Sequence, residues 1–246
     1  MTDGLRPAVV FERVSKSFGP KQVLNDISFE APAGKALCIL GRSGTGKSVT
    51  LKLIISLLKP DSGKIWVEDD DLTNLGSHQI PRIRRKMGFL FQDAALFDSL
   101  TLYENLALPL QRLTRKPPAE IDFVVDRVLG DVGLAGDKRK RPAELSGGMR
   151  KRAGLARALV LEPSILLADE PSSGLDRITA SEIDELLLRQ KAEKKTTLIV
   201  VTHDVHGAKR VADQIVVFDR GKLIARGAAA EIEHSENEVA RRLISE

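Results

Sequence analysis

The sequence is poor in cysteine and contains no long apolar run. Its single cysteine among 246 residues, Cys38, excludes an internal disulfide and favours a reducing compartment. Because Cys38 lies in the apolar run 35–40, we expect it to fill space in a buried strand. No uncharged apolar segment approaches ~18 residues, and the N-terminus lacks the apolar run of a signal peptide, so we expect a cytosolic chain without a membrane span.

Charge of one sign is not in excess either. The 38 basic and 34 acidic residues leave a net charge of +4, and the basic residues are scattered. This balance alone does not indicate a nucleic-acid or membrane-surface partner. The length suffices for one large α/β domain, or for a core that carries an inserted subdomain.

Residues 41–48 read Gly-Arg-Ser-Gly-Thr-Gly-Lys-Ser and fit the phosphate-loop pattern. An apolar run precedes them, and a segment of helical spacing at 49–58 follows, with Pro60 as its stop. Glycines let backbone N–H groups turn toward phosphate oxygens at the positive end of the helix. Lys47 would neutralise the terminal phosphates and the Ser48 hydroxyl would ligate Mg²⁺. A Gly/Ser-rich surface loop is the alternative, but it does not account for both flanks.

A carboxylate pair follows a later apolar run. Residues 164–168 predict a buried strand that delivers Asp169 and Glu170 at its C-terminal end, where open α/β sheets bind ligands. We expect Asp169 to hold Mg²⁺, directly or through water, and Glu170 to orient and deprotonate an attacking water. Two carboxylates on a solvated loop would not explain the apolar strand aimed at them.

Other motifs are weak when taken one at a time. Phe18 ends the first strand of a predicted antiparallel pair, 8–18 and 22–31, where it suits either purine stacking or core packing. A lone Gln92 after the strand 87–91 says little. His203, after the strand 197–201, is more often structural than catalytic when taken alone.

A second anion site is predicted at Ser146. Ser146 is a natural N-cap, and the N–H groups of Gly147 and Gly148 are exposed at the start of an amphipathic helix. This helix belongs to a helical stretch from about 100 to 159.

The remaining pattern predicts ordinary α/β elements. We expect a strand at 63–68 followed by an acidic surface turn at 69–71, and a helix from about 179 to 191. A hairpin at 214–227 leads to a terminal helix with an apolar stripe. That helix would cap its own core or lie on another subunit. The stripe comprises Ile232, Val239, Leu243 and Ile244.

The phosphate loop, Leu-Ser-Gly-Gly-Met at 145–149 and Ile-Leu-Leu-Ala-Asp-Glu at 165–170, in this order, resemble the ATP-binding subunits of ABC transporters. The likeness covers essentially the whole chain and implies an ATPase coupled to transport. It also implies that Phe18 stacks on adenine, that Gln92 contacts Mg²⁺ and the transmembrane partner, and that His203 contacts the γ-phosphate.

The resemblance implies an α/β fold: a P-loop NTPase core of the ABC ATPase type with an antiparallel β-subdomain and an inserted helical subdomain. We expect one nucleotide-binding domain over 1–246. Its core and β-subdomain would span about 1–99 and 160–228, the helical subdomain about 100–159, and a C-terminal helix about 229–246.

The resemblance also implies a head-to-tail dimer, because two anion sites exceed what one triphosphate needs on its own subunit. Each ATP would be held by the 41–48 loop of one copy and covered by Ser146 of the other, with the 172–176 loops between them. ATP binding would close the pair and Glu170-dependent hydrolysis would open it. The expected ATP contacts are Phe18, Gly41, Arg42, Ser43, Gly44, Thr45, Gly46, Lys47, Ser48, Val49, Ser146, Gly147 and Gly148. The expected Mg²⁺ contacts are Ser48, Gln92 and Asp169, and the expected catalytic residues are Glu170 and His203.

Three positions depart from the usual pattern of the family. Met149 stands where Gln usually ends the signature, Phe18 where Tyr is common, and Val49 where a hydroxyl residue often follows the Lys-Ser pair. Val49 loses one possible phosphate contact. None of the three removes a metal ligand, the base or a phosphate-loop group, so we expect ATPase activity to survive.

Residues 145–152 and 91–105, with Gly-Thr-Gly-Lys-Ser in the loop, look like the Mla/Mce-type branch. That branch powers phospholipid or other lipid movement between bacterial membranes, with a permease and an MCE-domain protein as partners. The family usually docks its membrane subunit on the segment from Gln92 to Tyr103, whose apolar residues suit a partner helix or internal packing. These residues are Leu96, Phe97, Leu100 and Tyr103.

The resulting hypothesis is a peripheral ATPase on the cytoplasmic side of the inner membrane that drives lipid transport. One alternative is the ATPase subunit of another ABC importer or exporter. Another is a soluble ABC ATPase that acts on DNA or ribosomes. Sustained heptads, a second phosphate loop and a basic tail are all lacking, so we expect no nucleic-acid partner.

Overall fold

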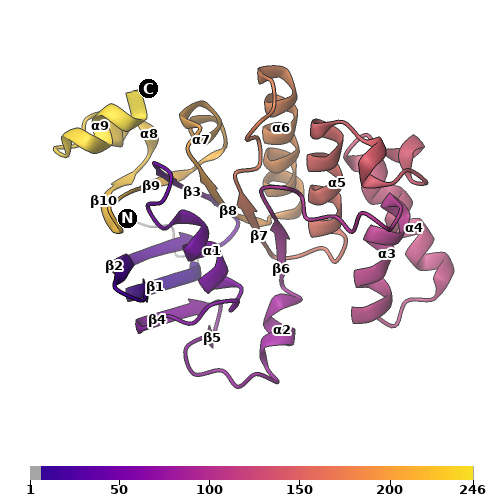
Figure 1. Cartoon of the computed structure of the whole chain (residues 1–246), viewed down its shortest axis with the longest axis horizontal. Helices are drawn as coiled ribbons and strands as arrows, with labels where there is room; N and C mark the ends of the chain where they lie inside the picture. The colour runs from indigo at the N-terminus through magenta and orange to yellow at the C-terminus, as the bar shows by residue number, and fades with distance from the viewer. Residues whose placement is uncertain (1–6, 246) are drawn as a thin grey trace.

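The computed structural model describes residues 7–245, which form two β-sheets and a set of helices (Figure 1). The smaller sheet has the strand order β2-β1-β4-β5 and the larger one β10-β9-β3-β8-β7-β6. The strands are β1 (Pro7–Phe18), β2 (Lys21–Pro32), β3 (Ala36–Gly41), β4 (Ser62–Val67), β5 (Asp70–Asp71), β6 (Met87–Leu90), β7 (Ile165–Asp169), β8 (Thr197–Thr202), β9 (Gln214–Asp219) and β10 (Lys222–Gly227).

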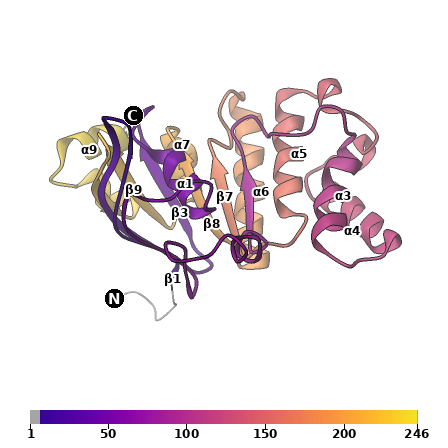
Figure 2. The same ribbon diagram turned by 60° about the horizontal axis from the view of Figure 1, so that its bottom comes forward.

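The helices lie at both ends of the larger sheet and over both of its faces (Figures 1 and 2). Helices α3, α4 and α5 lie together at one end, whereas α8 and α9 lie at the other. Their bounds are α1 (Lys47–Ile54), α2 (Ile80–Arg84), α3 (Leu102–Leu113), α4 (Pro118–Asp131), α5 (Gly147–Leu159), α6 (Arg177–Lys194), α7 (Val205–Val211), α8 (Ala229–Glu233) and α9 (Glu238–Ser245), with 3-10 turns at Ala135–Asp137 and Pro142–Glu144.

The central strand β3 explains the layering of the molecule. It pairs in parallel with β8 on one side and β9 on the other, and all six of its residues are buried. Successive side chains of a strand point to opposite faces. Leu37 and Ile39 therefore join a core with α1 and the smaller sheet, whereas Cys38 and Leu40 join a core with α5, α6 and α7.

Cys38 is a packing residue, as its place in the apolar run predicted. Its side chain is fully buried in the core beneath α6 and α7. Burial raises the pKa of the Cys38 thiol from 9.0 to about 12, with Asp184 adding to the rise and Lys191 opposing it. The thiol is therefore protonated and unreactive at neutral pH.

Helices α3, α4 and α5 share a hydrophobic cluster that is separate from the two cores on the faces of the larger sheet. Helix α3 begins at a capping box, in which Thr101 and Glu104 each bind the other's backbone N–H. Helix α4 begins at Pro118, where the missing N–H of proline costs no hydrogen bond. In α5, one face faces this cluster and another packs against β6, so the helix joins the bundle to the sheet.

Two predicted boundaries differ from the structure. The helix after the phosphate loop ends at Ile54 rather than near residue 58, because the chain turns at Ser56 with φ +55°. The acidic run 69–71 is not only a turn: Asp70 and Asp71 form the short strand β5, which pairs with Trp66 and Val67.

The C-terminal segment is two helices rather than the predicted single one. Helix α8 ends at Glu233, and Asn237 starts a new helix by accepting a hydrogen bond from the N–H of Ala240 at 3.1 Å. Ile232, Leu243 and Ile244 pack into the core under α7, so the segment caps its own domain. Val239 does not belong to this stripe, because it is 46% exposed.

Candidate active site

The phosphate loop, residues 41–48, runs from the end of β3 into α1 and needs its glycines. Gly44 and Gly46 have φ of +81° and +102°, a region that L side chains rarely adopt. A Cβ at Gly46 would lie 2.5 Å from Leu24 Cδ2 and 2.9 Å from the carbonyl oxygen of Val23. Strand β2 therefore presses against this turn, and no larger residue fits there.

Lys47, the first residue of α1, is only 6% exposed. Its ammonium donates hydrogen bonds to the carbonyl oxygens of Gly41 at 2.7 Å and Arg42 at 3.2 Å, and lies 3.6 Å from Glu170 Oε1. Burial lowers the pKa of Lys47, while Glu170 and Asp169 oppose the fall. The loop thus folds around a fixed cation at the sheet's C-terminal edge, where a phosphate anion would be attracted.

Ser48 and Asp169 join the phosphate loop to the end of β7. The Ser48 hydroxyl donates to Asp169 Oδ1 at 2.9 Å, and Asp169 is 7% exposed. Burial raises the pKa of Asp169, and the Ser48 hydrogen bond lowers it. A hydroxyl and a carboxylate supply the hard oxygen ligands that Mg²⁺ prefers, so this donor pair fits the ion.

Glu170 has a strained backbone and several partners. Its φ of +48° is rare for a residue with a Cβ, and its side chain is 11% exposed. Oε2 lies 2.8 Å from His203 Nδ1 and 3.3 Å from the N–H of His203, and accepts from the Thr202 hydroxyl at 3.2 Å. Glu170 and His203 both line a cavity of about 550 Å³ that extends toward α6 and α7. A water in this cavity would be within reach of the carboxylate.

His203 and Phe18 are both accessible to solvent, and the exposure of Phe18 does not fit the core-packing role that stood as its alternative. The His203 side chain is 61% exposed although it contacts Glu170. Phe18 is 47% exposed at the tip of the β1–β2 hairpin, with the Lys16 ammonium 5.6 Å from its ring centroid. The same hairpin carries Val23 and Leu24, which contact Gly46. Phe18 is thus free to stack on a base.

The remaining loop residues divide into exposed and packed ones. Arg42, Ser43 and Gly44 are exposed at the tip of the loop, whereas Thr45 is buried and donates to the Arg42 carbonyl at 2.9 Å. Val49 packs against the core beneath α1. The exposed tip offers its backbone groups to a ligand while the packed residues fix its shape.

Ser146, Gly147 and Gly148 lie apart from the phosphate loop, at the start of α5. The Ser146 hydroxyl caps this helix by accepting from the N–H of Met149 at 3.3 Å, as predicted. Gly148 is held so tightly that a Cβ would lie 2.4 Å from Thr179 Cγ2 of α6. Helices α1 and α5 lie on opposite sides of β7 in both ribbon views (Figures 1 and 2).

Gln92 lies with this second group of residues. It is exposed after β6 and lines a cavity of about 370 Å³ together with Gly147, Lys151 and the 173–175 loop. Within residues 7–245, no hydrogen bond joins Gln92 to Ser48 or Asp169, and no group of three His, Cys, Asp or Glu side chains is placed to hold a metal. Ser48 and Asp169 are therefore the predicted Mg²⁺ contacts that the structure brings together.

Sequence reasoning missed two buried charged residues near this site. Lys151 of α5 is 7% exposed and donates to the Glu170 carbonyl oxygen at 2.9 Å. Asp184 of α6 is 6% exposed beneath α7. One available signal for Lys151 was its position four residues before Leu155, on the apolar face of the predicted helix. No comparable signal marks Asp184, because its burial depends on how α7 packs.

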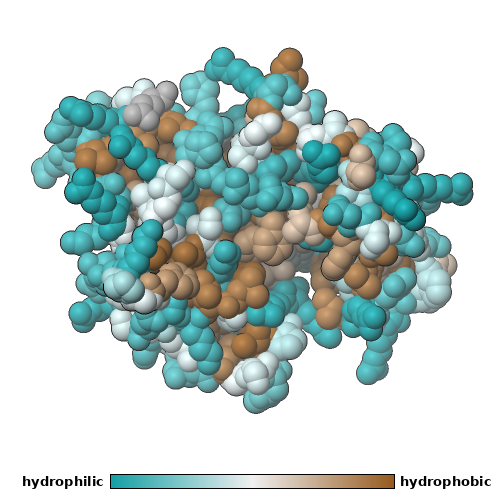
Figure 3. Space-filling view, viewed as in Figure 1, coloured by the Kyte–Doolittle hydropathy of each residue, from teal (hydrophilic) through white to brown (hydrophobic). Residues whose placement is uncertain are grey.

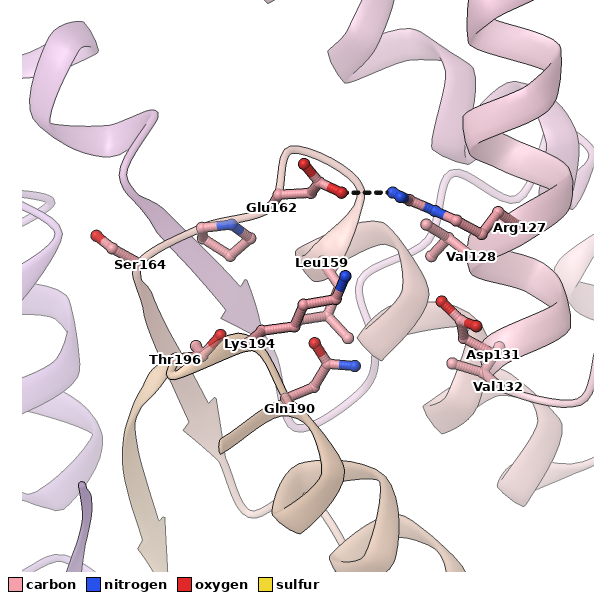
Figure 4. A pocket seen from close by; sticks show the side chains of 11 residues that line it. Arg127, Val128, Asp131, Val132, Leu159, Glu162, Ser164, Gln190, Lys194 and Thr196 are labelled. Atoms are coloured by element: carbon pink, nitrogen blue, oxygen red, sulfur yellow. Dashed lines mark hydrogen bonds and ion pairs between the residues drawn. The ribbon is translucent and has the colours of Figure 1, made fainter. Parts of the chain in front are cut away.

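Another cavity, of about 320 Å³, lies between α4, the loop after α5 and the end of α6 (Figure 4). Arg127 and Glu162 point toward each other across its mouth and form an ion pair of 2.6 Å. None of the predicted site residues lines it. In the part of the chain that the structure describes, no helix is long and apolar enough to cross a bilayer.

Comparison with protein families gives one match that contains both motifs of the site. The family described as "ABC transporter" matches residues 24–173, from β2 through the carboxylate pair. The probable ribonucleotide transport ATP-binding protein mkl of Mycobacterium leprae is 42% identical over 99% of this chain and 71% of its own length. A methionine import ATP-binding protein, MetN of Rhodopseudomonas palustris, is 40% identical over 90% of this chain and 60% of its own length.

Solved structures give the same result at the level of the fold. The ATP-binding cassette MJ0796, in a dimeric post-hydrolysis state bound to ADP and phosphate, superposes with a TM-score of 0.83. It is 32% identical in sequence and covers 89% of this chain and 98% of its own chain. The predicted P-loop core with an antiparallel sheet and helical parts is therefore confirmed.

Proposed function

The chain belongs to the ABC transporter family as an ATP-hydrolysing subunit, and we propose that Glu170 activates the water that attacks ATP bound at the phosphate loop. The observation that carries this assignment is the convergence of Lys47, Glu170 and His203. Glu170 lies 3.6 Å from the Lys47 ammonium and 2.8 Å from His203 Nδ1, on the wall of one cavity. A base, a phosphate-binding cation and an accessible imidazole thus share one place.

Each residue of this group has a distinct task in the proposal. The N–H groups of the 41–48 loop and the Lys47 ammonium hold the phosphates. Phe18 stacks on the adenine ring, and His203 donates a hydrogen bond toward the γ-phosphate. Glu170 accepts a proton from water through its carboxylate, which Thr202 and His203 orient.

Ser48 and Asp169 form the proposed Mg²⁺ site, with Gln92 as the further contact that the family resemblance implies. The ion, when bound, would neutralise negative charge on the phosphate oxygens. The protein's own contribution is to fix the two oxygen donors 2.9 Å apart at the end of β7.

A head-to-tail dimer of the chain completes the proposed site. Ser146, Gly147 and Gly148 present N–H groups at the start of α5, but within one copy they face the 173–175 loop rather than the phosphate loop. A second copy would bring its own α5 terminus over the bound ATP. The dimeric state of MJ0796 with ADP and phosphate supports this arrangement.

The proposed docking site for a separate membrane permease is the segment 92–103. Leu96 and Tyr103 pack against the cluster of α3, α4 and α5, so internal packing accounts for these two. Phe97 instead is 53% exposed. Hydrophobic side chains gather on the molecular face over α3 (Figure 3). Phe97 is the most exposed of the four apolar residues of this segment, and so it is the side chain best placed to contact a partner helix.

The proposed cargo is a lipid, with phospholipid as the leading candidate. The proposal rests on the likeness of 91–105 and 145–152 to the Mla/Mce-type branch, and it implies a permease and an MCE-domain protein as partners. The chain would then work at the cytoplasmic side of the inner membrane, without contact to nucleic acid. A solute importer is the second candidate, because the relatives are named for ribonucleotide transport and methionine import.

The test is to purify a tagged Glu170→Gln variant with ATP from detergent-solubilised membranes of the native host. The Lys47→Ala/Glu170→Gln double variant, which we expect not to close on ATP, is the matched control. A permease, an MCE-domain protein and bound phospholipid, recovered only with the single variant, would support lipid transport. A permease that binds a ribonucleotide or an amino acid, without the MCE-domain protein, would establish the second candidate.

A further Phe97→Asp substitution in the tagged protein tests the docking site. We expect it to prevent recovery of the permease and to leave ATP binding unchanged, because Phe97 lies outside the nucleotide site. If the Phe97→Asp protein recovered as much permease as the protein with Phe97 intact, Phe97 would not belong to the docking site.

A further inference from the structure

Lys151 is a buried cation that the proposed ATPase mechanism has not yet used. It lies on α5, five residues after Ser146, and is 7% exposed. Its ammonium donates to the Glu170 carbonyl oxygen at 2.9 Å and lies 3.4 Å from the Ser173 hydroxyl. Within residues 7–245, no carboxylate forms an ion pair with it. A long cationic side chain has thus been buried to reach one backbone carbonyl.

The carbonyl that Lys151 contacts belongs to a strained residue. Glu170 has φ +48°, and such a conformation persists only where surrounding contacts hold it. Three donors converge on its carbonyl oxygen: the Lys151 ammonium at 2.9 Å, the Ser173 hydroxyl at 2.9 Å and the Ser173 N–H at 3.2 Å. Of these, only Lys151 comes from another element. The other two belong to the same turn and would move with it.

The position of this peptide decides where the Glu170 carboxylate points. The carboxylate reaches Thr202, the last residue of β8, and His203, which follows it. Rotation of the Glu170 peptide would carry the carboxylate away from these partners. A displacement of about 1 Å at a reacting group can cost up to a hundredfold in rate.

We propose that Lys151 is a positioning residue that clamps the Glu170 peptide and links it to the Ser146 end of α5. This inference rests on the proposed role of Glu170 as the base. Because Ser146 and Lys151 share one rigid helix, a ligand that seats the start of α5 would also set the Glu170 carbonyl. Lys151 therefore links the Ser146 end of α5, which covers the ATP of the second copy, to Glu170, which acts on the ATP of its own copy.

Removing the Lys151 ammonium is expected to lower activity without lowering stability. Removing a buried ammonium relieves its desolvation, so the fold should not lose stability. Lys151→Met keeps the length and the apolar stem of the side chain but removes the donor. Lys151→Gln keeps an N–H donor without the charge, and it serves as the conservative rescue.

The experiment compares these two variants with the wild-type chain. For Lys151→Met we expect kcat to fall about 10- to 100-fold, with KM for ATP within about twofold and an undiminished thermal midpoint. Lys151→Gln should recover kcat to within about threefold of wild type, because one hydrogen bond to the carbonyl is regained. Amide hydrogen exchange of Glu170, Ser172 and Ser173 should be faster in Lys151→Met than in Lys151→Gln.

A Glu170→Gln variant measured in parallel distinguishes failure of the Lys151 proposal from failure of the proposal that Glu170 is the base. Full hydrolysis in Glu170→Gln would overturn the base assignment and the positioning role with it. Loss of hydrolysis in Glu170→Gln, together with wild-type kcat in Lys151→Met, would overturn the positioning role alone. Equal loss of kcat and of thermal midpoint in both Lys151 variants would identify Lys151 as a purely structural residue and would also overturn the proposal.

Discussion

The end of β7 and the start of α5 are both expected to face ATP, yet they are built differently. At β7, Asp169 and Glu170 are buried and bind side chains from the phosphate loop and β8. At α5, Ser146 is exposed and its hydroxyl only caps its own helix. The first place binds its partners within one copy. The second offers N–H groups at a cavity that Asp93, Arg150 and Lys151 also line, and no phosphate-loop residue of the same copy lines that cavity. We infer that the two places act on different ATP molecules.

The largest effect is expected at the β7 side. Glu170→Gln removes the proposed base and should lower the rate of hydrolysis about 10²- to 10⁴-fold, while ATP remains bound. Steady-state phosphate release and equilibrium ATP binding measure the two quantities. Thr202→Val is the matched control: it removes one hydrogen bond of Glu170 Oε2 and should reduce hydrolysis far less. Undiminished hydrolysis in Glu170→Gln would mean that another group activates the water.

The next effect tests whether the two sides belong to different copies. Lys47→Ala disables the phosphate loop, and Ser146→Asp places a negative charge where the phosphates would lie while keeping a good N-cap. Each variant alone should lack activity. Their mixture should regain about a quarter of the wild-type rate, because random pairing gives about half heterodimers, each with one intact site of two.

Two controls sharpen the mixing experiment. Ser146→Ala removes the cap without adding charge, so it should retain more activity than Ser146→Asp. Mixing Lys47→Ala with Glu170→Gln should restore nothing, since both changes lie on the β7 side and no pairing yields an intact site. Activity in that second mixture, or none in the first, would contradict the head-to-tail arrangement.

A smaller effect is expected at the Mg²⁺ contact. Ser48→Ala removes one oxygen donor beside Asp169, and the Mg²⁺ concentration for half-maximal hydrolysis should rise about tenfold. Ser48→Thr keeps the hydroxyl and should behave like the wild type. Chelation of Mg²⁺ should stop hydrolysis in all three proteins. An unchanged Mg²⁺ requirement in Ser48→Ala would remove Ser48 from the proposed site.

Local sequence patterns predicted the phosphate loop and the carboxylate pair, but they did not predict the contacts that these residues make with distant parts of the chain. The phosphate loop and the apolar run before Asp169 are contiguous signals, and the helix cap at Ser146 is a local one. The contacts of Lys151 and Glu170 join residues 19 apart in the chain, and those of Glu170 and Thr202 join residues 32 apart. Such pairs depend on how the helices pack on the sheet. The break before α9 was missed although its signal is local, because Asn237 is a preferred N-cap residue and accepts from the N–H of Ala240 three residues on.

Asp184 offers the closest contrast with Glu170. Both are buried acidic residues, and both interact with the segment after β8, Glu170 with His203 and Asp184 with Asp204. Glu170 has hydrogen-bond partners on β8, whereas no hydrogen bond or ion pair reaches the Asp184 carboxylate within residues 7–245. Burial raises the pKa of Asp184 from 3.8 to about 6, Arg210 lowers it, and Asp204 and Glu185 raise it further. A raised pKa means that the folded state binds the proton more tightly than the unfolded chain does.

The contribution of Asp184 to the stability of the wild-type protein should therefore fall as the pH rises from about 4 through about 6, because the buried carboxylate then ionises. Asp184→Asn removes this titration and should raise the free energy of unfolding by about 2 kcal/mol at pH 7, with the gain vanishing below about pH 4. Denaturant unfolding at several pH values measures it. Glu182→Gln, an exposed neighbour on α6, should change stability by less than about 0.5 kcal/mol. A gain in Asp184→Asn that did not vary with pH would mean that packing rather than charge sets the cost, and that the contrast with Glu170 does not lie in its hydrogen-bond partners.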